Sequence, residues 1–283
     1  MKKWRLIFTG DQDAFYNMAL DEALLFSCQE QNSPPILRLY RWDPPGISLG
    51  YSQPVTRTID LKKCRDHHID MVRRITGGRA VLHENELTYS ICANTGKYPD
   101  LGQSNIQTYQ KISWALLESL GFLGITAEWH KPSREKESLS SHKSHFKPCF
   151  VSTSRYEITV EGRKLIGSAQ RRFGFRSNRK TTESFIQHGS ILTGKGRLSI
   201  AEFLPEGSPA EALSQSLEER STNIEEILKR PVKTDEMILA LKTGFSSAFD
   251  IELVDSCITE AEREKAKVLN QGKYHSIEWN YQR

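Results

Sequence analysis

Cysteine is scarce in this sequence and shows no pairing pattern. Among 283 residues there are five cysteines, and no two of them form a C-x-x-C pair. They are Cys28, Cys64, Cys92, Cys149 and Cys257. An odd number of scattered cysteines argues against a disulfide framework, and the absence of close pairs argues against a zinc knuckle. We therefore expect free thiols and leave open whether one of them is a nucleophile.

Long apolar runs and several well-known ligand motifs are also missing. No uninterrupted apolar run approaches the roughly 20 residues that a membrane helix needs. The opening stretch MKKWRLIFTGDQDAF lacks the apolar segment of a secretory signal. No G-x-x-x-x-G-K-[ST], G-x-G-x-x-G or H-E-x-x-H motif occurs. The sequence therefore predicts a cytoplasmic protein with no membrane partner and without the nucleotide and metal sites that these motifs form.

The excess of one charge over the other is small. The chain has 39 lysines and arginines against 35 aspartates and glutamates, a formal net charge of +4. This balance suits an acidic protein partner but falls short of a dedicated nucleic-acid binder. We interpret the basic stretch RRFGFRSNRK, residues 171–180, as a solvated turn and expect no nucleic-acid partner.

Apolar periodicity and turn residues predict alternating helices and strands. Helices are expected at residues 13–28 and 109–122, the second with Gly121 as its C-cap. Residues 36–42 and 46–52 flank a proline-rich turn and are expected to form a pair of strands. Further strands are expected within residues 69–75, 79–94 and 184–192, and on both sides of a turn at Glu161–Gly162.

The last third of the chain shifts toward helix. From about residue 208, helix-forming stretches follow two S/T-x-x-E capping boxes, which begin at Ser208 and Thr259. The alternation before that point predicts an α/β (α+β) fold, with a mixed β-sheet flanked by helices. We expect residues 1–245 to form one large domain and residues 246–283 a short helical extension packed on it.

A basic, glycine-containing run, RRITGGRAVLHENELTYS at residues 73–90, lies between strand-like segments. Gly77 and Gly78 permit positive φ angles and close approach of the backbone, and arginines including Arg74 and Arg79 place positive charge beside them. Such a loop is able to hold a phosphate, an adenylate or the thioester end of a phosphopantetheine arm. A β-hairpin turn with solvated arginines explains the same pattern equally well.

Other residues are candidates for chemistry, each with a plainer explanation. A nucleophilic cysteine needs a nearby cation or base to form a thiolate, and Lys164 on a neighbouring predicted strand is able to serve Cys149 in this way. The alternative is a core cysteine and a surface lysine. His142, His145 and Cys149 lack a fourth ligand nearby, so we expect no metal site. His83 is either a structural histidine or a catalyst.

Five motifs in order resemble those of the biotin/lipoate protein ligase and lipoyl-transferase superfamily. They are FYNMALDEALL (15–25), RRITGGRAVLHENELTYS (73–90), GRKLIGSAQRR (162–172), QHGSIL (187–192) and KYHSIEWNYQR (273–283). Arg79 stands where lipoate-protein ligases carry a third glycine, and a cysteine precedes GRKLIGSAQ. In both respects the chain is similar to the LipM-type octanoyltransferases. The resemblance implies a biotin/lipoate protein ligase type of catalytic domain over residues 1–245.

The resemblance also implies roles for individual residues. Cys149 is implied to be the nucleophile that carries the acyl group as a thioester, and Lys164 to hold the acyl carbonyl or support the thiolate. The implied substrate-binding residues are Arg74, Gly77, Gly78, Arg79, His83, Gly167, Ser168 and Ala169, of which the last three line an acyl tunnel. No metal or other cofactor is implied.

The implied reaction is an octanoyl transfer that needs no ATP. Octanoyl-acyl carrier protein passes its acyl group to Cys149 by a nearly thermoneutral thioester exchange, and a lysine of an apo lipoyl domain then attacks the enzyme thioester. The expected acceptor is the glycine cleavage H protein or a dehydrogenase E2 subunit. Three alternatives stay open: an ATP-dependent lipoate-protein ligase, a lipoyl/octanoyl amidotransferase and a non-catalytic acyl-protein binder. The polar stretch 131–148 stays unassigned.

Overall fold

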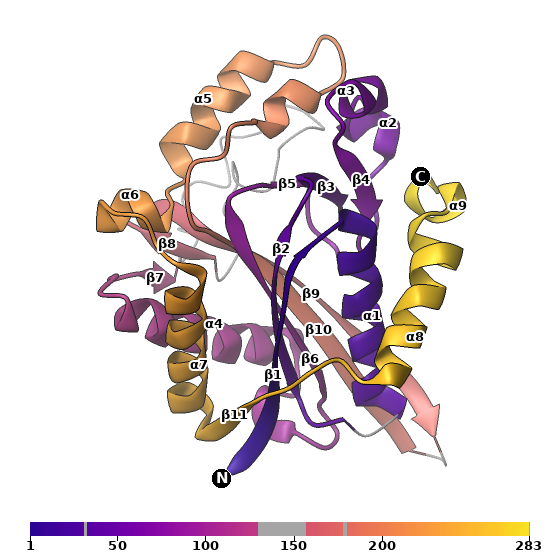
Figure 1. Cartoon of the computed structure of the whole chain (residues 1–283), viewed down its shortest axis with the longest axis vertical. Helices are drawn as coiled ribbons and strands as arrows, with labels where there is room; N and C mark the ends of the chain where they lie inside the picture. Colours follow the sequence, from indigo (N-terminus) through magenta and orange to yellow (C-terminus); the bar gives the residue numbers. More distant parts are fainter. Residues whose placement is uncertain (31–32, 130–156, 178–179, 283) are drawn as a thin grey trace.

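An eight-stranded mixed sheet forms the centre of the computed structural model, which describes residues 1–30, 33–129, 157–177 and 180–282, without the side chains of residues 175–182. The strand order is β11-β1-β2-β6-β10-β9-β8-β7 (Figure 1). Their bounds are β1 Lys2–Gln12, β2 Ile36–Trp42, β6 Glu86–Asn94, β7 Glu128–Trp129, β8 Ile158–Val160, β9 Arg163–Ser177, β10 Lys180–Leu192 and β11 Ile251–Asp255. Strands β2 and β11 lie parallel to β1 on either side of it, and the other neighbours are antiparallel.

Helices cover both faces of this sheet. On one face α4 (Asn105–Phe122) packs against α7 (Thr234–Phe249), and on the other α1 (Ala14–Glu30) packs against α8 (Glu260–Leu269), as Figure 1 shows. The prediction of a mixed sheet flanked by helices is confirmed. No helix in the described ranges is both long and apolar enough to cross a bilayer.

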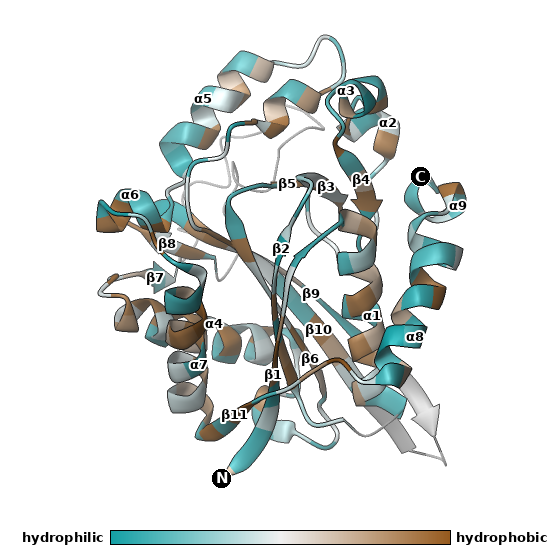
Figure 2. Ribbon diagram, viewed as in Figure 1, coloured by the Kyte–Doolittle hydropathy of each residue, from teal (hydrophilic) through white to brown (hydrophobic). Residues whose placement is uncertain are grey.

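The side chains of the central strands divide between two cores. In β6, Leu87, Tyr89 and Ile91 join the core under α4 and α7, whereas Cys92 joins the core under α1. This is the alternation that a strand buried on both faces requires. Figure 2 shows the hydrophobic positions concentrated on the central strands and on α1, whereas α5 (Ala210–Arg220) is largely hydrophilic.

A second, three-stranded sheet lies beside the large one. Its order is β4-β3-β5, with β3 at Gly46–Leu49, β4 at Asp70–Arg73 and β5 at Val81–His83. Strand β3 is parallel to β4 and antiparallel to β5. The remaining short helices are α2 Val55–Thr58, α3 Leu61–Asp66, α6 Ile224–Leu228 and α9 Ile277–Asn280, with 3-10 turns at Pro99–Leu101 and Ile200–Phe203 and a π turn at Asn270–Tyr274.

This second sheet corrects two expectations of strand pairing. The strands predicted at residues 36–42 and 46–52 exist, but they belong to different sheets and do not pair with each other. The Gly77–Gly78 turn is not a hairpin, because β4 and β5 lie on opposite sides of β3. In both cases the turn residues were identified correctly, and the strand partner came from elsewhere in the chain.

The helix ends confirm some sequence signals and correct others. The capping box at Thr259 is present, with Glu262 as its partner. The box predicted at Ser208 is absent, because α5 follows Pro209 without a side-chain cap. A box that the sequence reading missed stands at Ser199. Gly121 lies inside α4 and is not its C-cap.

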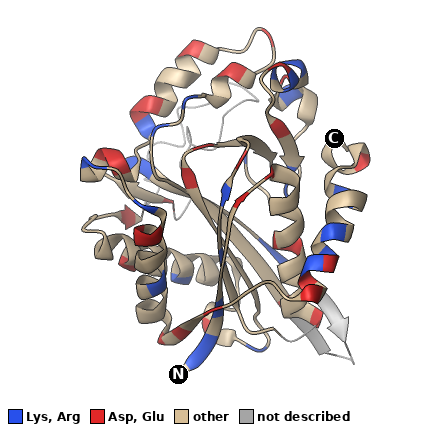
Figure 3. Ribbon diagram, viewed as in Figure 1, with Lys and Arg blue, Asp and Glu red and all other residues tan. Residues whose placement is uncertain are grey.

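Two long elements bear on further expectations, the solvated turn at residues 171–180 and the division of the chain at residue 245. Residues 171–180 are not a solvated turn, since most of them belong to the long β9–β10 hairpin. Residue 245 lies inside α7, and the segment that follows is not wholly helical, because it contributes β11 to the large sheet. Charges of both signs are interspersed along the ribbon, with no single basic face in view (Figure 3).

Candidate functional site

A small cavity of about 40 Å³ lies where the second sheet meets the centre of the large one, and we call it the acyl cavity after the role that the family resemblance implies for its lining residues. Six of the eight predicted substrate-binding residues line it: Arg74, Gly78, His83, Gly167, Ser168 and Ala169. Tyr40 and Trp42 of β2 and Met18 of α1 complete much of its wall. Gly77 and Arg79 are not among its lining residues; Gly77 is exposed and Arg79 is half-buried. The structure thus brings together most of a set that the sequence spreads over about 100 positions.

The paired strands β9 and β10 form one wall of this cavity. In their antiparallel register, Ala169 lies opposite His188 and Ser168 opposite Gly189. A Cβ atom at Gly189 would lie 2.5 Å from the Gly167 carbonyl oxygen and 2.6 Å from Ser168 Oγ. Only glycine fits such an approach, so the small residues of this wall serve tight packing and cavity shape together.

Arg74 in the glycine-containing turn is held by hydrogen bonds to the backbone. Arg74 is buried and donates hydrogen bonds to the carbonyl oxygens of Ser48, Gly77 and Arg79 at 2.8–3.1 Å. This network closes the turn around its own guanidinium, while Gly78 takes a φ of +96°. The alternative of a hairpin turn with solvated arginines is therefore wrong for Arg74.

Arg73 is fully buried and ties the same turn to two distant segments. It donates to the carbonyl oxygens of Gly50, Tyr51 and Gln53 and to that of Asn280 near the end of the chain, at 2.8–3.1 Å. Five guanidinium donors make arginine suited to gathering several carbonyls at once. Arg73 therefore anchors the turn and is not available to bind an anionic substrate from solution.

A hydroxyl–imidazole–carboxylate chain borders the acyl cavity through His83. Its Nδ1 lies 2.8 Å from Glu86 Oε1, and its Nε2 lies 2.7 Å from Ser48 Oγ. Arg74 also donates to Ser48 Oγ at 3.0 Å, so the Ser48 hydroxyl joins the guanidinium of Arg74 to the His83 ring. The ring also stacks on Trp42, with centroids 3.8 Å apart. His83 is held rigidly, as a structural histidine is, and still forms part of the cavity wall.

A second chain of the same kind runs through His188. Its Nδ1 lies 3.0 Å from Asp21 Oδ2, and its Nε2 lies 2.6 Å from Thr76 Oγ1 in the glycine-containing turn. Burial lowers the pKa of His188 below its usual value, although Asp21 opposes that shift. The neutral ring therefore donates from Nδ1 to Asp21 and accepts from Thr76.

Asp21 is the charged centre of this second chain. Its carboxylate also accepts from Arg38 at 2.8 Å and from the Tyr40 hydroxyl at 3.0 Å. Burial by itself raises the pKa of Asp21, but the hydrogen bond from His188 and the charge of Arg38 outweigh it, so the pKa lies below the usual value. Most buried polar side-chain atoms around the cavity thus bind one another, with Glu86 Oε2 an exception, and most of the remaining cavity wall is carbon.

Lys164 is buried and paired, which excludes the surface lysine considered above. Its Nζ lies 2.6 Å from Glu157 Oε1, and both side chains are almost fully hidden from solvent. Its carbonyl oxygen accepts from the backbone N–H of Thr222 at 3.0 Å. Two buried opposite charges this close fix the position of the ammonium group. Sequence reading missed Glu157, because no motif marks it.

Cys149, together with His142 and His145, lies outside the described residues. Of the four described cysteines, three are buried, and burial raises the pKa of each. The pKa of Cys64, for example, rises to about 11. A buried thiol of high pKa is a poor nucleophile. Among the described residues, no three histidine, cysteine, aspartate or glutamate side chains are grouped to hold a metal ion.

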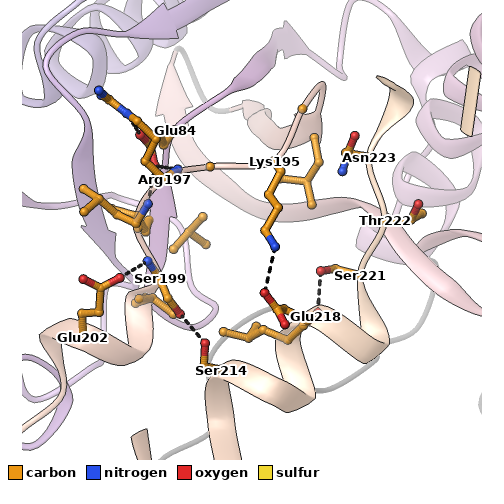
Figure 4. Close-up of a pocket in the computed structure, with 18 of the residues that line it drawn as sticks. Glu84, Lys195, Arg197, Ser199, Glu202, Ser214, Glu218, Ser221, Thr222 and Asn223 are labelled. Atoms are coloured by element: carbon orange, nitrogen blue, oxygen red, sulfur yellow. Dashed lines mark hydrogen bonds and ion pairs between the residues drawn. The ribbon is translucent and has the colours of Figure 1, made fainter. Parts of the chain in front are cut away.

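A larger cleft of about 540 Å³ adjoins the acyl cavity; we call it the outer cleft. It is bounded by β5, by residues 192–202, by α5 and by residues 221–226, and Figure 4 shows its side chains. Val81 lines both the outer cleft and the acyl cavity. No sequence motif pointed to this cleft.

Comparisons with known proteins agree on one family. The family model for the lipoyl protein ligase A/B catalytic domain matches residues 13–246. A protein named octanoyltransferase LipM from Halalkalibacterium halodurans is 36% identical over 285 residues, with 100% of both chains covered. Octanoyltransferase LipM from Bacillus subtilis (strain 168) is 35% identical over 282 residues, covering 99% of this chain and 98% of the relative.

Solved structures support the same fold. Lipoate-protein ligase A bound with ATP has a TM-score of 0.78 at 24% identity, with 99% of both chains covered. A bi-partite lipoate protein ligase from Thermoplasma acidophilum has a TM-score of 0.77 at 24% identity, covering 99% of this chain and 97% of that one. At these sequence identities the two structures are evidence for the fold alone.

Proposed function

Because this chain belongs to the lipoyl protein ligase A/B catalytic-domain family, we propose that it is an octanoyltransferase acting in lipoate biosynthesis. It moves an octanoyl group from acyl carrier protein to a lysine of an apo lipoyl domain, that of the glycine cleavage H protein or of a dehydrogenase E2 subunit. The structural observation that carries this proposal is the acyl cavity. Its wall is built from the residues that the family resemblance assigns to the substrate, and its polar atoms are paired with each other.

The reaction proceeds in two acyl transfers. The Cys149 thiol loses its proton, and the thiolate attacks the thioester carbonyl of octanoyl-acyl carrier protein. The carrier sulfur leaves as a thiolate and takes up a proton, and an S-octanoyl enzyme remains. The acceptor lysine amine then attacks this second thioester, the Cys149 sulfur leaves, and the amine proton is released. One thioester replaces another in the first step, and an amide replaces a thioester in the second, so no ATP is consumed.

The assignment of Cys149 rests on the family resemblance and gains support by elimination. Cys28, Cys64 and Cys92 are buried thiols with raised pKa values. Cys257 is exposed but does not line the acyl cavity. Lys164, held by Glu157, supplies the positive charge that the developing oxyanion or the thiolate needs. The four described cysteines are free, which suits the reducing cytoplasm that we propose as the site of this reaction.

The experiment is intact-protein mass spectrometry of the enzyme mixed with octanoyl-acyl carrier protein in the absence of ATP, followed by apo H protein. The wild type is expected to gain one octanoyl group and lose it to the H protein, whereas Cys149→Ser does neither. Cys257→Ser is the matched control and behaves as the wild type. If transfer occurs only after ATP and free octanoate are added, the protein is a ligase and the proposal is wrong.

A further inference from the structure

The proposed reaction assigns no role to the outer cleft, the larger of the two hollows beside the glycine-containing turn. It adjoins the acyl cavity on one side through Val81, in the strand that follows the glycine-containing turn. On the other side it is bounded by Ser221 and Thr222, whose backbone pairs with that of Lys164. The outer cleft therefore lies between the cavity wall and the strand position of the lysine that the resemblance places at the acyl carbonyl.

The charged groups of the outer cleft neutralise one another. Arg163 pairs with Glu226 at 2.6 Å, Lys195 with Glu218 at 3.0 Å, and Arg197 with Glu84 at 3.1 Å. A fourth carboxylate, that of Glu202, accepts from the Ser199 backbone N–H at 2.6 Å. The lining residues thus carry one more carboxylate than cation. Such a cleft offers a triphosphate no lining cation that is not already paired, whereas an uncharged ligand need not break any of these pairs.

The uncharged groups of the outer cleft suit a ligand that alternates apolar segments with amides. Leu198 and Leu217 offer apolar surface. Ser199, Ser214 and Asn223 add polar atoms, of which the two serine hydroxyls bind each other and Asn223 Oδ1 caps α6. Figure 4 shows Ser214 directed from α5 toward Ser199, and their hydroxyl oxygens are 3.4 Å apart. The volume of about 540 Å³ falls within the range of small-molecule sites.

We infer that the outer cleft binds the uncharged, amide-bearing pantetheine arm of the thioester donor. This inference rests on the proposed function, because the arm matters only if the acyl group arrives as a thioester. In this arrangement the octanoyl chain enters the acyl cavity, which must widen from its volume of about 40 Å³ to admit it, and the arm lies in the outer cleft between β5 and α5. No covalent step is added, since the cleft only positions the donor.

The test compares two octanoyl thioesters that differ in arm length. S-octanoyl-pantetheine carries the full arm, and S-octanoyl-N-acetylcysteamine carries only its last part. Acylation of the enzyme is followed by intact-protein mass spectrometry, and kcat/KM is measured for each donor. We expect the wild type to prefer the full arm by about tenfold or more, mainly through KM, because the extra atoms contact the cleft.

Two variants of α5 make the test specific. Ser214→Trp fills the cleft and is expected to remove most of the preference for the long arm. Gln215→Trp adds the same side chain at the next, exposed position, outside the cleft, and is expected to keep the preference. The wild-type comparison stands even if Ser214→Trp fails to fold.

Three results decide between the possibilities. A wild-type preference that Ser214→Trp lowers and Gln215→Trp preserves supports the inference. Equal kcat/KM values for the two donors in the wild type overturn the inference and leave the proposed function standing. No acylation from either thioester, together with acylation from octanoate and ATP, overturns the proposed function and the inference with it.

Discussion

At the scale of single residues, the pair formed by Glu157 and Lys164 carries the sharpest prediction. Glu157→Gln removes the carboxylate that faces the buried ammonium, and we expect a loss of stability of about 3–5 kcal/mol together with slower octanoyl transfer. Thermal unfolding and the mass-spectrometric acylation assay measure the two effects. The matched control is Glu226→Gln. Its partner Arg163 lies next to Lys164 on β9 but is partly exposed, so we expect a loss of stability of less than about 1 kcal/mol.

The double variant Glu157→Gln/Lys164→Met separates structure from chemistry. It removes both charges, so most of the lost stability should return while transfer stays low. If the double variant transfers octanoyl at the wild-type rate, neither side chain serves the reaction.

This pair also shows where sequence reasoning stops at the residue scale. The turn at Glu161–Gly162 was predicted correctly and places Thr159 opposite Lys164. Glu157, two residues before Thr159, reaches the ammonium group beside a register shift between Ile158 and Thr159. The resemblance identified Lys164, but a bulge has no reliable sequence signal.

His188 gives a pH prediction with a definite sign. The pKa of His188 in the folded protein lies below the usual value of about 6.5. Just below pH 6.5, His188 is therefore protonated in the unfolded chain and neutral in the folded chain. The free energy of unfolding should therefore fall as the pH is lowered below 6.5, by up to about 1.4 kcal/mol per pH unit from this residue. Urea unfolding between pH 7.5 and 5 measures the slope. His188→Gln should flatten it; an unchanged slope in that variant would assign the effect to other groups.

At the scale of elements, the position of the glycine-containing turn depends on how closely it approaches the end of β3. A Cβ atom at Gly50 would lie 2.0 Å from the Gly78 carbonyl oxygen. Gly50→Ala should therefore displace the turn from the acyl cavity and lower octanoyl transfer at least tenfold, as expected when reacting groups are misplaced by about 1 Å. Steady-state transfer assays test this.

Gly121→Ala is the control for this prediction. Gly121 lies within α4 with nothing within 4 Å of a new Cβ, so alanine should stabilise the protein by about 0.5–1 kcal/mol and leave transfer unchanged. Equal activity in both glycine variants would show that the turn tolerates displacement.

Sequence patterns predicted where the strands lie along the chain far better than they predicted which strands pair with each other. The strand at residues 36–42 was expected from its composition and appears as β2, Ile36–Trp42. Its neighbours are β1 and β6, about 30 and 50 positions away along the chain, whereas the adjacent proline-rich turn favoured a local pairing. Local signals fix where a strand begins and ends, and long-range packing fixes which strand it joins.

At the scale of the whole molecule, the end of the chain is part of the structure that supports the site. Strand β11 pairs with β1, and α8 packs on α1. Lys273 and Tyr274 both donate to Glu22 on α1, at 2.6–2.8 Å. Beyond them, Asn280 supplies its carbonyl oxygen to the buried guanidinium of Arg73. Composition alone predicted a peripheral helical extension, because none of these contacts joins residues that are near in sequence.

Two truncations test whether the carboxyl-terminal segment is separable, as the division at residue 245 supposes. A chain ending at residue 245 cuts α7 and removes β11 and α8; since α1 would then expose apolar surface, we expect no cooperative unfolding transition by circular dichroism. A chain ending at residue 276 keeps β11, α8 and Tyr274 but removes the acceptors that Trp279 and Asn280 offer to Arg73. It should fold with a stability lower by about 2–4 kcal/mol and transfer octanoyl more slowly, because Arg73 also holds the loop at residues 50–53 beneath the glycine-containing turn. A stable, active chain ending at residue 245 would show instead that residues 246–283 are dispensable and that the contacts to Arg73 contribute little.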